Sequence, residues 1–206
     1  MARSKRIQYL AELSKGFDKV LDIGTDHGFV LEIAFENHWI KSAIASDLRE
    51  KPLNQAREHL REYPVDYVIS DGFENIKQDF DLAIIAGMGA YLITDILDHA
   101  PLGNQTYLLQ ANEKIEILRD YLVTHGFMIM DEYITFDKFF YVILKVKRGQ
   151  MVLSDEDLYL GPKLKHKSEA LPYYEKKASQ IAKILPKTDK NRQETLEKML
   201  KIYKNI

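Results

Sequence analysis

Asp22-Ile-Gly-Thr-Asp-His-Gly28 stands at the junction of two patterns of apolar residues. The run Lys19–Ile23 is short and apolar, as in a buried β-strand, whereas residues 29–37 have the spacing of an amphipathic helix. A glycine-containing turn between a strand and a helix leaves backbone N–H groups free and lets a ligand approach closely. In Rossmann-like folds this turn binds a nucleotide-containing ligand.

The rest of the first 150 residues repeats this alternation. We predict strands at 42–47, 65–69, 81–86 and 106–110, helices at 7–13, 51–63, 90–100 and 113–124, and a β-hairpin from 127–134 and 139–147. Residues 71–80 are too few for a crossover helix, so we expect only a turn or short helix there. Alternating strands and helices give a parallel sheet. The predicted fold is α/β and Rossmann-like: a mostly parallel seven-stranded sheet ending in an antiparallel hairpin, as in class I methyltransferases.

A different pattern follows. Apolar residues recur at steps of three and four on both sides of Pro186, which predicts an antiparallel helical hairpin. We therefore expect a Rossmann-like domain at 1–160 and a helical, coiled-coil-like domain at 161–206, and expect a chain ending near Leu160 to fold. Residues 161–206 carry eleven Lys and one Arg against five acids, a net charge of +7, which leaves −9 for residues 1–160. Such a tail is typical of contact with a polyanion, or of a helical pair that needs lysines for solubility.

The glycine spacing indicates the kind of cofactor. The dinucleotide pattern G-x-G-x-x-G fails after Gly24, whereas acidic-x-G-x-G-x-G fits with one change, Asp26 in place of the middle glycine. A carboxylate beside a pyrophosphate costs about 1 kcal/mol or more at about 4 Å even in water. S-adenosylmethionine has no phosphate and carries a sulfonium and an ammonium group, so acids are favourable beside it. The turn therefore predicts S-adenosylmethionine as cofactor.

Three further strand ends carry candidate contacts. Asp47, 25 residues after Asp22, is placed to accept hydrogen bonds from ribose hydroxyls, or to cap the next helix. Asp71-Gly72 could contact the adenine edge or form a simple turn. Ala86-Gly-Met-Gly-Ala90 leaves room for a flat base, or allows close packing. The candidate cofactor contacts are Asp22, Gly24, Thr25, Gly28, Asp47, Leu48, Asp71, Gly72, Ala86, Gly87 and Met88.

Several classes of function are disfavoured. With no cysteine, the chain can have no disulfide framework, thiol nucleophile or zinc–thiolate site. The six histidines lack metal-ligand spacing, and no apolar run approaches the roughly 20 residues of a membrane span. We expect a cytoplasmic, monomeric protein without metal or membrane contacts. Two alternatives stay open: a nucleotide-dependent oxidoreductase on the same fold, and a non-catalytic RNA-binding module.

Six motifs together resemble the bacterial tRNA (adenine(22)-N1)-methyltransferases. They are D-I-G-T-D-H-G from Asp22, A-S-D from Ala45, S-D-G from Ser70, I-A-G-M-G from Ile85, L-L-Q-A-N from Leu108 and L-R-D-Y-L-x-x-H-G-F from Leu118. The resemblance extends through Lys147 and is looser in the tail. It implies methyl transfer to N1 of adenine 22 in tRNA, with the helical tail helping to hold the tRNA.

The same resemblance places Asp26 on the acid implicated in catalysis in that family. Adenine N1 already has a lone pair, so the reaction needs mainly in-line orientation, which can supply several kcal/mol. The product ring becomes positively charged, and a nearby carboxylate would stabilise it. We therefore expect Asp26 to be catalytic, with His27 orienting the base or Asp26. The alternative is that Asp26 only caps the loop through backbone N–H groups.

Overall fold

The computed structural model describes residues 4–206, apart from the side chain of Asn191. Seven strands form one sheet in the order β3-β2-β1-β4-β5-β7-β6. Their bounds are β1 Lys19–Ile23, β2 Ser42–Asp47, β3 Val65–Ile69, β4 Leu82–Met88, β5 Thr106–Ala111, β6 Phe127–Phe136 and β7 Phe140–Arg148. The first five are parallel, and β7 is antiparallel to both β5 and β6. The predicted fold class is confirmed.

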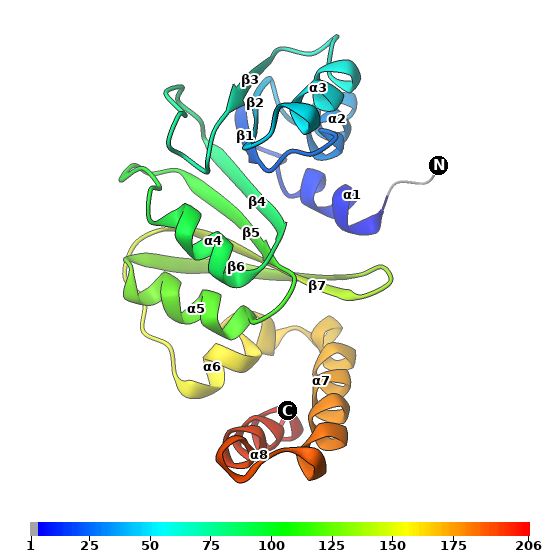
Figure 1. The fold of residues 1–206 in the computed structure, drawn as a ribbon, viewed down its shortest axis with the longest axis vertical. Helices are drawn as coiled ribbons and strands as arrows, with labels where there is room; N and C mark the ends of the chain where they lie inside the picture. The colour runs from blue at the N-terminus through cyan, green and yellow to red at the C-terminus, as the bar shows by residue number, and fades with distance from the viewer. Residues whose placement is uncertain (1–3) are drawn as a thin grey trace.

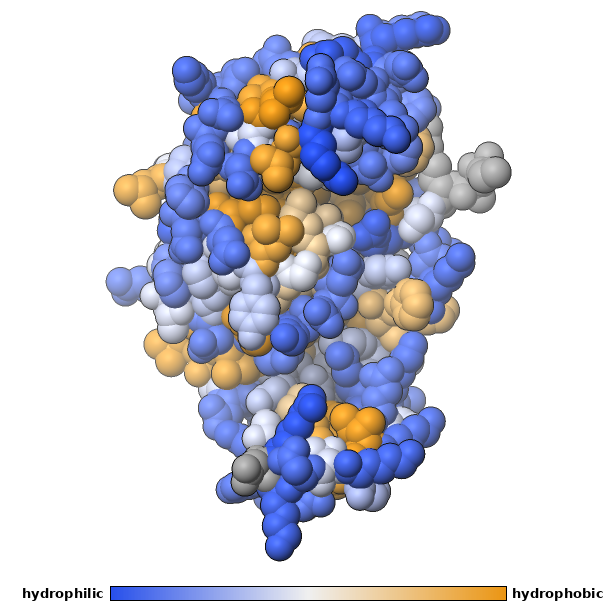
Figure 2. All heavy atoms as spheres, viewed as in Figure 1, coloured by the Kyte–Doolittle hydropathy of each residue, from blue (hydrophilic) through white to orange (hydrophobic). Residues whose placement is uncertain are grey.

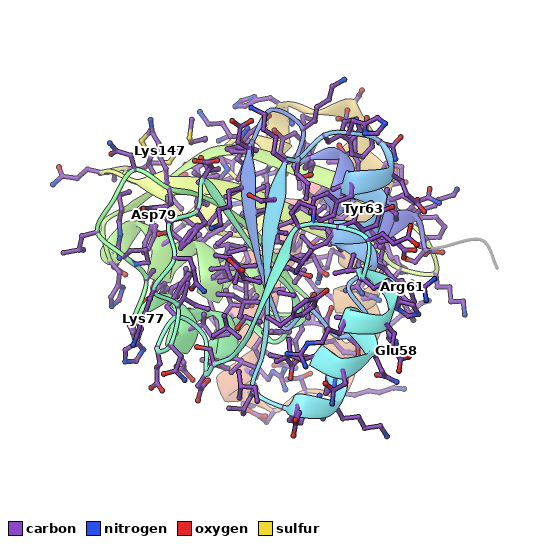
Figure 3. The ribbon with its side chains drawn as sticks, turned by 90° about the horizontal axis from the view of Figure 1, so that it is seen from above. Glu58, Arg61, Tyr63, Lys77, Asp79 and Lys147 are labelled. Carbon is purple, nitrogen blue, oxygen red and sulfur yellow. The ribbon has the colours of Figure 1, made fainter. Side chains whose placement is uncertain are left out.

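Helices cover both faces of the sheet (Figure 1). One face carries α1 Lys5–Glu12, α2 Phe29–Glu36 and α3 Glu50–His59, and the other carries α4 Ala90–Leu97 and α5 Ile115–Thr124. In Figure 3, which looks down on the molecule, Glu58, Arg61 and Tyr63 lie on the α3 side, whereas Lys77, Asp79 and Lys147 lie on the opposite side. The sheet is therefore the middle layer of three.

Side chains alternate between the two faces along the central strands. Leu21, Ile85 and Leu109 belong to the core beneath α4 and α5, and their neighbours Val20, Ile84 and Leu108 belong to the core beneath α1, α2 and α3. This period of two places every residue of a strand against one apolar layer or the other. It explains why these strands have continuous apolar sequences.

The largest differences from the predicted elements are at helix ends. α3 ends at His59 rather than Tyr63, and α4 ends at Leu97 rather than Ala100. Turns and bends connect each helix end to the proline that follows, Pro64 or Pro101, whereas proline disfavours helical geometry only at the residue immediately before it. Residues 71–80 form turns without a helix, as expected.

The chain after β7 forms more helices than the two predicted. α6 Asp155–Leu160 comes first, followed by the short 3₁₀ helices η1 Leu164–His166 and η2 Ser168–Ala170. The expected hairpin is α7 Leu171–Ile184 and α8 Lys190–Lys204, joined through η3 Leu185–Lys187. It lies at the end of the molecule beyond α5 and α6 (Figure 1), and hydrophilic residues cover most of its visible face (Figure 2).

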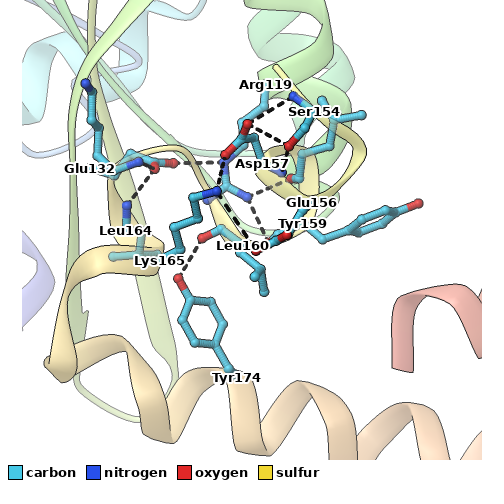
Figure 4. A network of polar contacts seen from close by, with 12 residues as sticks. Arg119, Glu132, Ser154, Glu156, Asp157, Tyr159, Leu160, Leu164, Lys165 and Tyr174 are labelled. Atoms are coloured by element: carbon cyan, nitrogen blue, oxygen red, sulfur yellow. Dashed lines mark hydrogen bonds and ion pairs between the residues drawn. The ribbon is translucent and has the colours of Figure 1, made fainter. Parts of the chain in front are cut away.

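A buried ion pair connects this tail to the sheet (Figure 4). Arg119 of α5 donates from Nε to Glu132 Oε1 of β6 at 2.8 Å, and both side chains are fully buried. Arg119 Nη1 also donates to the backbone carbonyls of Leu158 and Tyr159. Glu132 Oε2 accepts the backbone N–H groups of residues 163 and 164 at 2.9 Å each. The pair therefore holds both ends of the turn between α6 and η1.

The tail also shares the hydrophobic core of the sheet. Tyr174, Ile181 and Tyr203 belong to the same buried cluster as the residues beneath α4 and α5, and the Tyr174 hydroxyl donates to Leu160 O at 2.6 Å. A chain ending near Leu160 would leave Glu132 without two of its donors. We therefore revise our expectation and anticipate that such a chain is unstable. The division into two domains at residue 160 stays a prediction.

The first testable prediction concerns this pair. Arg119→Met should destabilise the protein by about 3–5 kcal/mol, because Glu132 would remain buried without its countercharge. Urea unfolding followed by circular dichroism measures the change. The control is Lys198→Met, which breaks the exposed ion pair with Asp155 and should leave the midpoint almost unchanged. Equal effects of the two substitutions would contradict the role of the buried pair.

Candidate cofactor and active site

The turn after β1 is held against the neighbouring strands. Gly24 N and Thr25 N both donate to Ser46 O of β2, at 2.8 and 3.0 Å. Gly24 has φ +77°, and a Cβ there would collide with the terminal methyl of Met88. Gly28 has φ +72°, and a Cβ there would lie 2.7 Å from Leu60 Cδ1. Both positions therefore require glycine.

Asp22 is a buried acid at the base of this turn. Its Oδ2 accepts the Thr25 hydroxyl at 2.7 Å. Burial raises the pKa of Asp22 to about 6, the Thr25 hydrogen bond opposes this shift, and the carboxylates of Asp47 and Asp26 add to it. Three acids thus lie close enough to interact. A cationic ligand placed among them would relieve both the repulsion and the cost of burial.

The ends of β2 and β3 supply the next group of candidates. Asp47 is buried and its Oδ1 accepts Arg49 N at 2.9 Å, whereas the neighbouring Leu48 is 63% exposed. Ser70 N donates to Asp47 O, which places Asp71 and Gly72 beside the end of β2. Asp71 is exposed, and Gly72 is buried against Ile96. The structure therefore brings these four candidates to one edge of the sheet.

The end of β4 is joined to β5 and α1 by a polar network that our sequence analysis did not identify. Gly87, with φ +79°, lies in a bulge between Ala86 and Met88. Its N–H donates to Gln110 Oε1 at 3.2 Å, and its carbonyl accepts Asn112 Nδ2 at 2.8 Å. Arg6 of α1 donates to the same Gln110 oxygen at 2.8 Å. Gln110 and Asn112 belong to the L-L-Q-A-N motif, so that motif was the available signal, whereas nothing in the pattern around Arg6 pointed to the site.

Asp26 and His27 occupy the crest of the loop. Asp26 has φ +49°, the left-handed conformation that explains why glycine usually stands there and that Asp tolerates better than most residues. Its side chain is 70% exposed, and its Oδ1 lies 3.8 Å from His27 Nε2. The His27 ring stacks on Phe29, which stacks on His59, with centroids 5.1 Å apart in each pair. The two expected catalytic residues are thus neighbours, and His27 is supported by aromatic rings.

Within residues 4–206, no group of three or more His, Asp or Glu side chains is arranged to hold a metal ion. None of the helices described is long and apolar enough to cross a membrane.

The fold and this site together define a class of protein. The strand order with its terminal antiparallel hairpin and the acidic-x-G turn are those of a Rossmann-like methyltransferase that uses S-adenosylmethionine. The residues fit that cofactor, because three interacting acids surround a glycine-lined turn that would repel a pyrophosphate.

Comparison with known proteins identifies the family. The sequence model of the family TrmK, tRNA (adenine(22)-N(1))-methyltransferase, matches residues 20–205. This chain therefore belongs to the tRNA (adenine(22)-N(1))-methyltransferase family. The membership supports a methyltransferase over an oxidoreductase or a non-catalytic RNA-binding module.

Individual relatives agree with this assignment. The tRNA (adenine(22)-N(1))-methyltransferase of Bacillus subtilis is 32% identical over 139 residues, which are 64% of this chain and 58% of the relative's length. A Streptococcus pneumoniae candidate tRNA (m1A22) methyltransferase, solved with S-adenosyl-L-methionine, is 29% identical with a TM-score of 0.88, over 99% of each chain. The solved B. subtilis m1A22 tRNA methyltransferase, at 24% identity, shares the fold with a TM-score of 0.86 over 99% of this chain and 98% of its own.

The titration of Asp22 generates the second prediction. A bound cation favours ionised Asp22, so binding of S-adenosylmethionine should release a proton when the pH is below the pKa of about 6. Affinity should therefore fall about tenfold between pH 7 and pH 5. Calorimetry at pH 5, 6 and 7 measures this, and buffers of different ionisation enthalpy report the released proton.

Two variants separate Asp22 from the nearby histidine. Asp22→Asn should bind more weakly at every pH and lose the pH dependence. His27→Gln should keep the dependence, because His27 does not supply the titrating carboxylate. A wild-type affinity that is flat from pH 5 to 7 would show that Asp22 is not at the cofactor's cationic end.

Proposed function

We propose that this protein transfers a methyl group from S-adenosylmethionine to N1 of an adenine in tRNA, at position 22. Family membership and the names of the relatives support the substrate and the position. The observation that carries the proposal is the junction at Met88. Its methyl group packs against Gly24 of the cofactor turn, while its carbonyl accepts Asn112 N at 2.8 Å on the other side. A base placed over this open strand end would lie beside the cofactor.

The residues around the turn have distinct roles in this proposal. Asp22 and Thr25, with the backbone at Gly24 and Gly28, hold the amino-acid end of the cofactor. Asp47 accepts hydrogen bonds from the ribose hydroxyls. The adenine would lie against exposed Leu48, with Asp71 and Gly72 at its edge. Ala86, Gly87 and Met88 form the floor beneath the group to be transferred.

The chemistry needs little proton transfer from the protein. S-adenosylmethionine supplies an electrophilic methyl group on a sulfonium. Adenine N1 attacks with its own lone pair, so the enzyme's contribution is orientation and stabilisation of the charge that develops on the ring. Asp26 is exposed toward solvent beside this region and can accept a hydrogen bond from the 6-amino group. His27, stacked on Phe29, positions Asp26 or the base.

The tail contributes to tRNA binding with only part of its charge. Lys165, Lys167 and Lys198 form ion pairs with Asp157, Asp131 and Asp155 of residues 1–160. These lysines attach the C-terminal helices to residues 1–160, which the charge count alone could not show. The remaining tail cations are available to phosphates. A monomeric state and a cytoplasmic location stay predictions.

Methylation of a defined transcript tests the proposed function. Unmodified tRNA transcripts with adenine at position 22 are incubated with the protein and labelled S-adenosylmethionine, and the modified nucleoside is identified and mapped by mass spectrometry. We expect 1-methyladenosine at position 22, and no product from a matched transcript with guanine there. Product at another position or another atom would overturn the assignment.

The third prediction concerns Asp26. Asp26→Asn should lower the single-turnover rate by roughly 10²-fold while S-adenosylmethionine affinity changes little, as expected for a charge that acts mainly in the transition state. Asn tolerates the left-handed backbone, so the loop should keep its shape. Rapid-quench measurements at saturating tRNA give the rate. The control is Asp18→Ala, an exposed acid just before β1, at the opposite end of the strand from the site. A wild-type rate for Asp26→Asn would leave Asp26 as a loop cap.

A further inference from the structure

A pocket lies next to the end of β5 and includes no residue of the cofactor turn. It has a volume of about 460 Å³ and is formed by three segments: the turn from β5 to α5, the start of β7 and the first half of α7. Its lining residues are Ala111, Asn112, Glu113, Lys114, Ile115, Phe139, Phe140, Tyr141, Val142, Tyr173, Lys176, Lys177 and Gln180. The volume falls within the roughly 300–1,000 Å³ that is typical of small-ligand sites.

The lining combines flat apolar walls with a cationic rim. Ile115, Val142 and Tyr173 are buried and form the apolar floor. Phe139 is 61% exposed, so its ring is accessible to a ligand. Lys176 Nζ lies 6.0 Å from the Phe139 ring and 5.5 Å from the Phe140 ring. A planar ring could therefore stack on an aromatic wall while an anion binds at the rim.

The lysines of the rim are available to an anion. Lys114, Lys176 and Lys177 form no ion pair with any acid in the described residues, and each lies over an aromatic ring instead. The single acid of the lining, Glu113, leaves the pocket with an excess of positive charge. This contrasts with the three acids around Asp22. The pocket is thus suited to a phosphate, which the cofactor turn is not.

Asn112 connects the pocket to the end of β4, where the methyl group would be transferred. Asn112 lines it and donates from Nδ2 to Gly87 O, while its N–H donates to Met88 O. Lys114 lies 4.7 Å over the ring of Tyr91, which stands at the start of α4 immediately after the I-A-G-M-G motif. Met88 touches Gly24 on its other side. The order across the molecule is therefore cofactor turn, Met88, Asn112 and pocket.

We propose that this pocket binds an unstacked tRNA nucleotide next to the adenine that is methylated, with its base on Phe139 and its phosphate on Lys176 and Lys177. The inference rests on the proposed function, since it names a second subsite for the same substrate. Stacking on aromatic side chains and phosphate contacts from lysine are the usual means of holding single-stranded RNA. The target adenine would lie at Met88, between this pocket and the cofactor turn. Capture of the flanking nucleotide would add to the affinity for tRNA without contacting the reacting adenine.

Binding of unmodified tRNA transcript by pocket variants tests this proposal. Phe139→Ala and the double variant Lys176→Ala/Lys177→Ala should each weaken tRNA binding about tenfold. The double variant should also reduce the slope of log affinity against log salt by about 0.7, because the two lysines share one phosphate and each phosphate contact on single-stranded RNA contributes about that much. Single-turnover rates at saturating tRNA should stay within about threefold of wild type, and S-adenosylmethionine affinity should not change. Filter binding, rapid quench and calorimetry give the three quantities.

The matched control is Lys183→Ala/Lys187→Ala, which removes the same charge from the exposed far end of α7 and from η3. It should weaken binding less than the pocket variant. Phe139→Trp should bind like wild type, because the stacking surface is kept. The proposal is overturned if the pocket variants match the control, or if tRNA affinity is unchanged. It is also overturned if Phe139→Ala abolishes turnover at saturating tRNA, because the pocket would then hold the target base itself. Failure of the wild-type protein to methylate tRNA would instead refute the proposed function.

Discussion

The buried pair between Arg119 and Glu132 is the interaction on which the arrangement of the molecule depends. It joins α5 and β6 to the turn that follows α6, and the chain continues from that turn through η1 and η2 to α7. Desolvating two charges is costly, and backbone carbonyls and N–H groups offset part of this cost by bonding to the pair, although Arg119 Nη2 has no partner. Gly161 is required there, because a Cβ would collide with the Glu132 carboxylate. The position of α7, and with it one wall of the pocket beside the site, follows from this contact.

The site itself depends on a second constraint, the close approach of β1 and β4. Gly24 and Gly87 both have positive φ, and Met88 fills the space that a side chain at Gly24 would need. Gln110 then joins β4 to α1 by accepting hydrogen bonds from both Gly87 N and Arg6. These side-chain hydrogen bonds add to the ladder pairing of β4 with β5, which continues through Met88. The carboxyl ends of β1 and β4, where a cofactor and a base would meet, are therefore fixed relative to each other and to α1.

The central strands of the sheet were predicted from nearly continuous apolar runs, because they are buried on both faces. The edge strand β3 and the hairpin β6–β7 were predicted from β-rich segments bounded by turn residues. The cofactor turn was equally accessible, since its glycines and acids are contiguous in the chain. Arg6, Arg119 and Glu132 could not be found in this way. Charged residues in a helix or strand normally face solvent, and only the tertiary fold brings Arg119 to Glu132 or Arg6 to Gln110. For the same reason, the contacts between the C-terminal helices and the sheet could not be inferred from an abrupt change in charge.

The distribution of charge explains how two neighbouring sites can serve ligands of opposite sign. Asp22, Asp26 and Asp47 surround the cofactor turn, whereas Lys114, Lys176 and Lys177 line the pocket beyond Asn112. A uniformly cationic cleft would weaken binding of a sulfonium, and a uniformly acidic one would repel RNA. At physiological salt, exposed charges are largely screened beyond about 8 Å, so the two fields can coexist in neighbouring sites. Met88 and Asn112, which are uncharged, stand between them. The neutral strand end is therefore the place where a cationic donor and a polyanionic substrate can both approach without either site weakening the other.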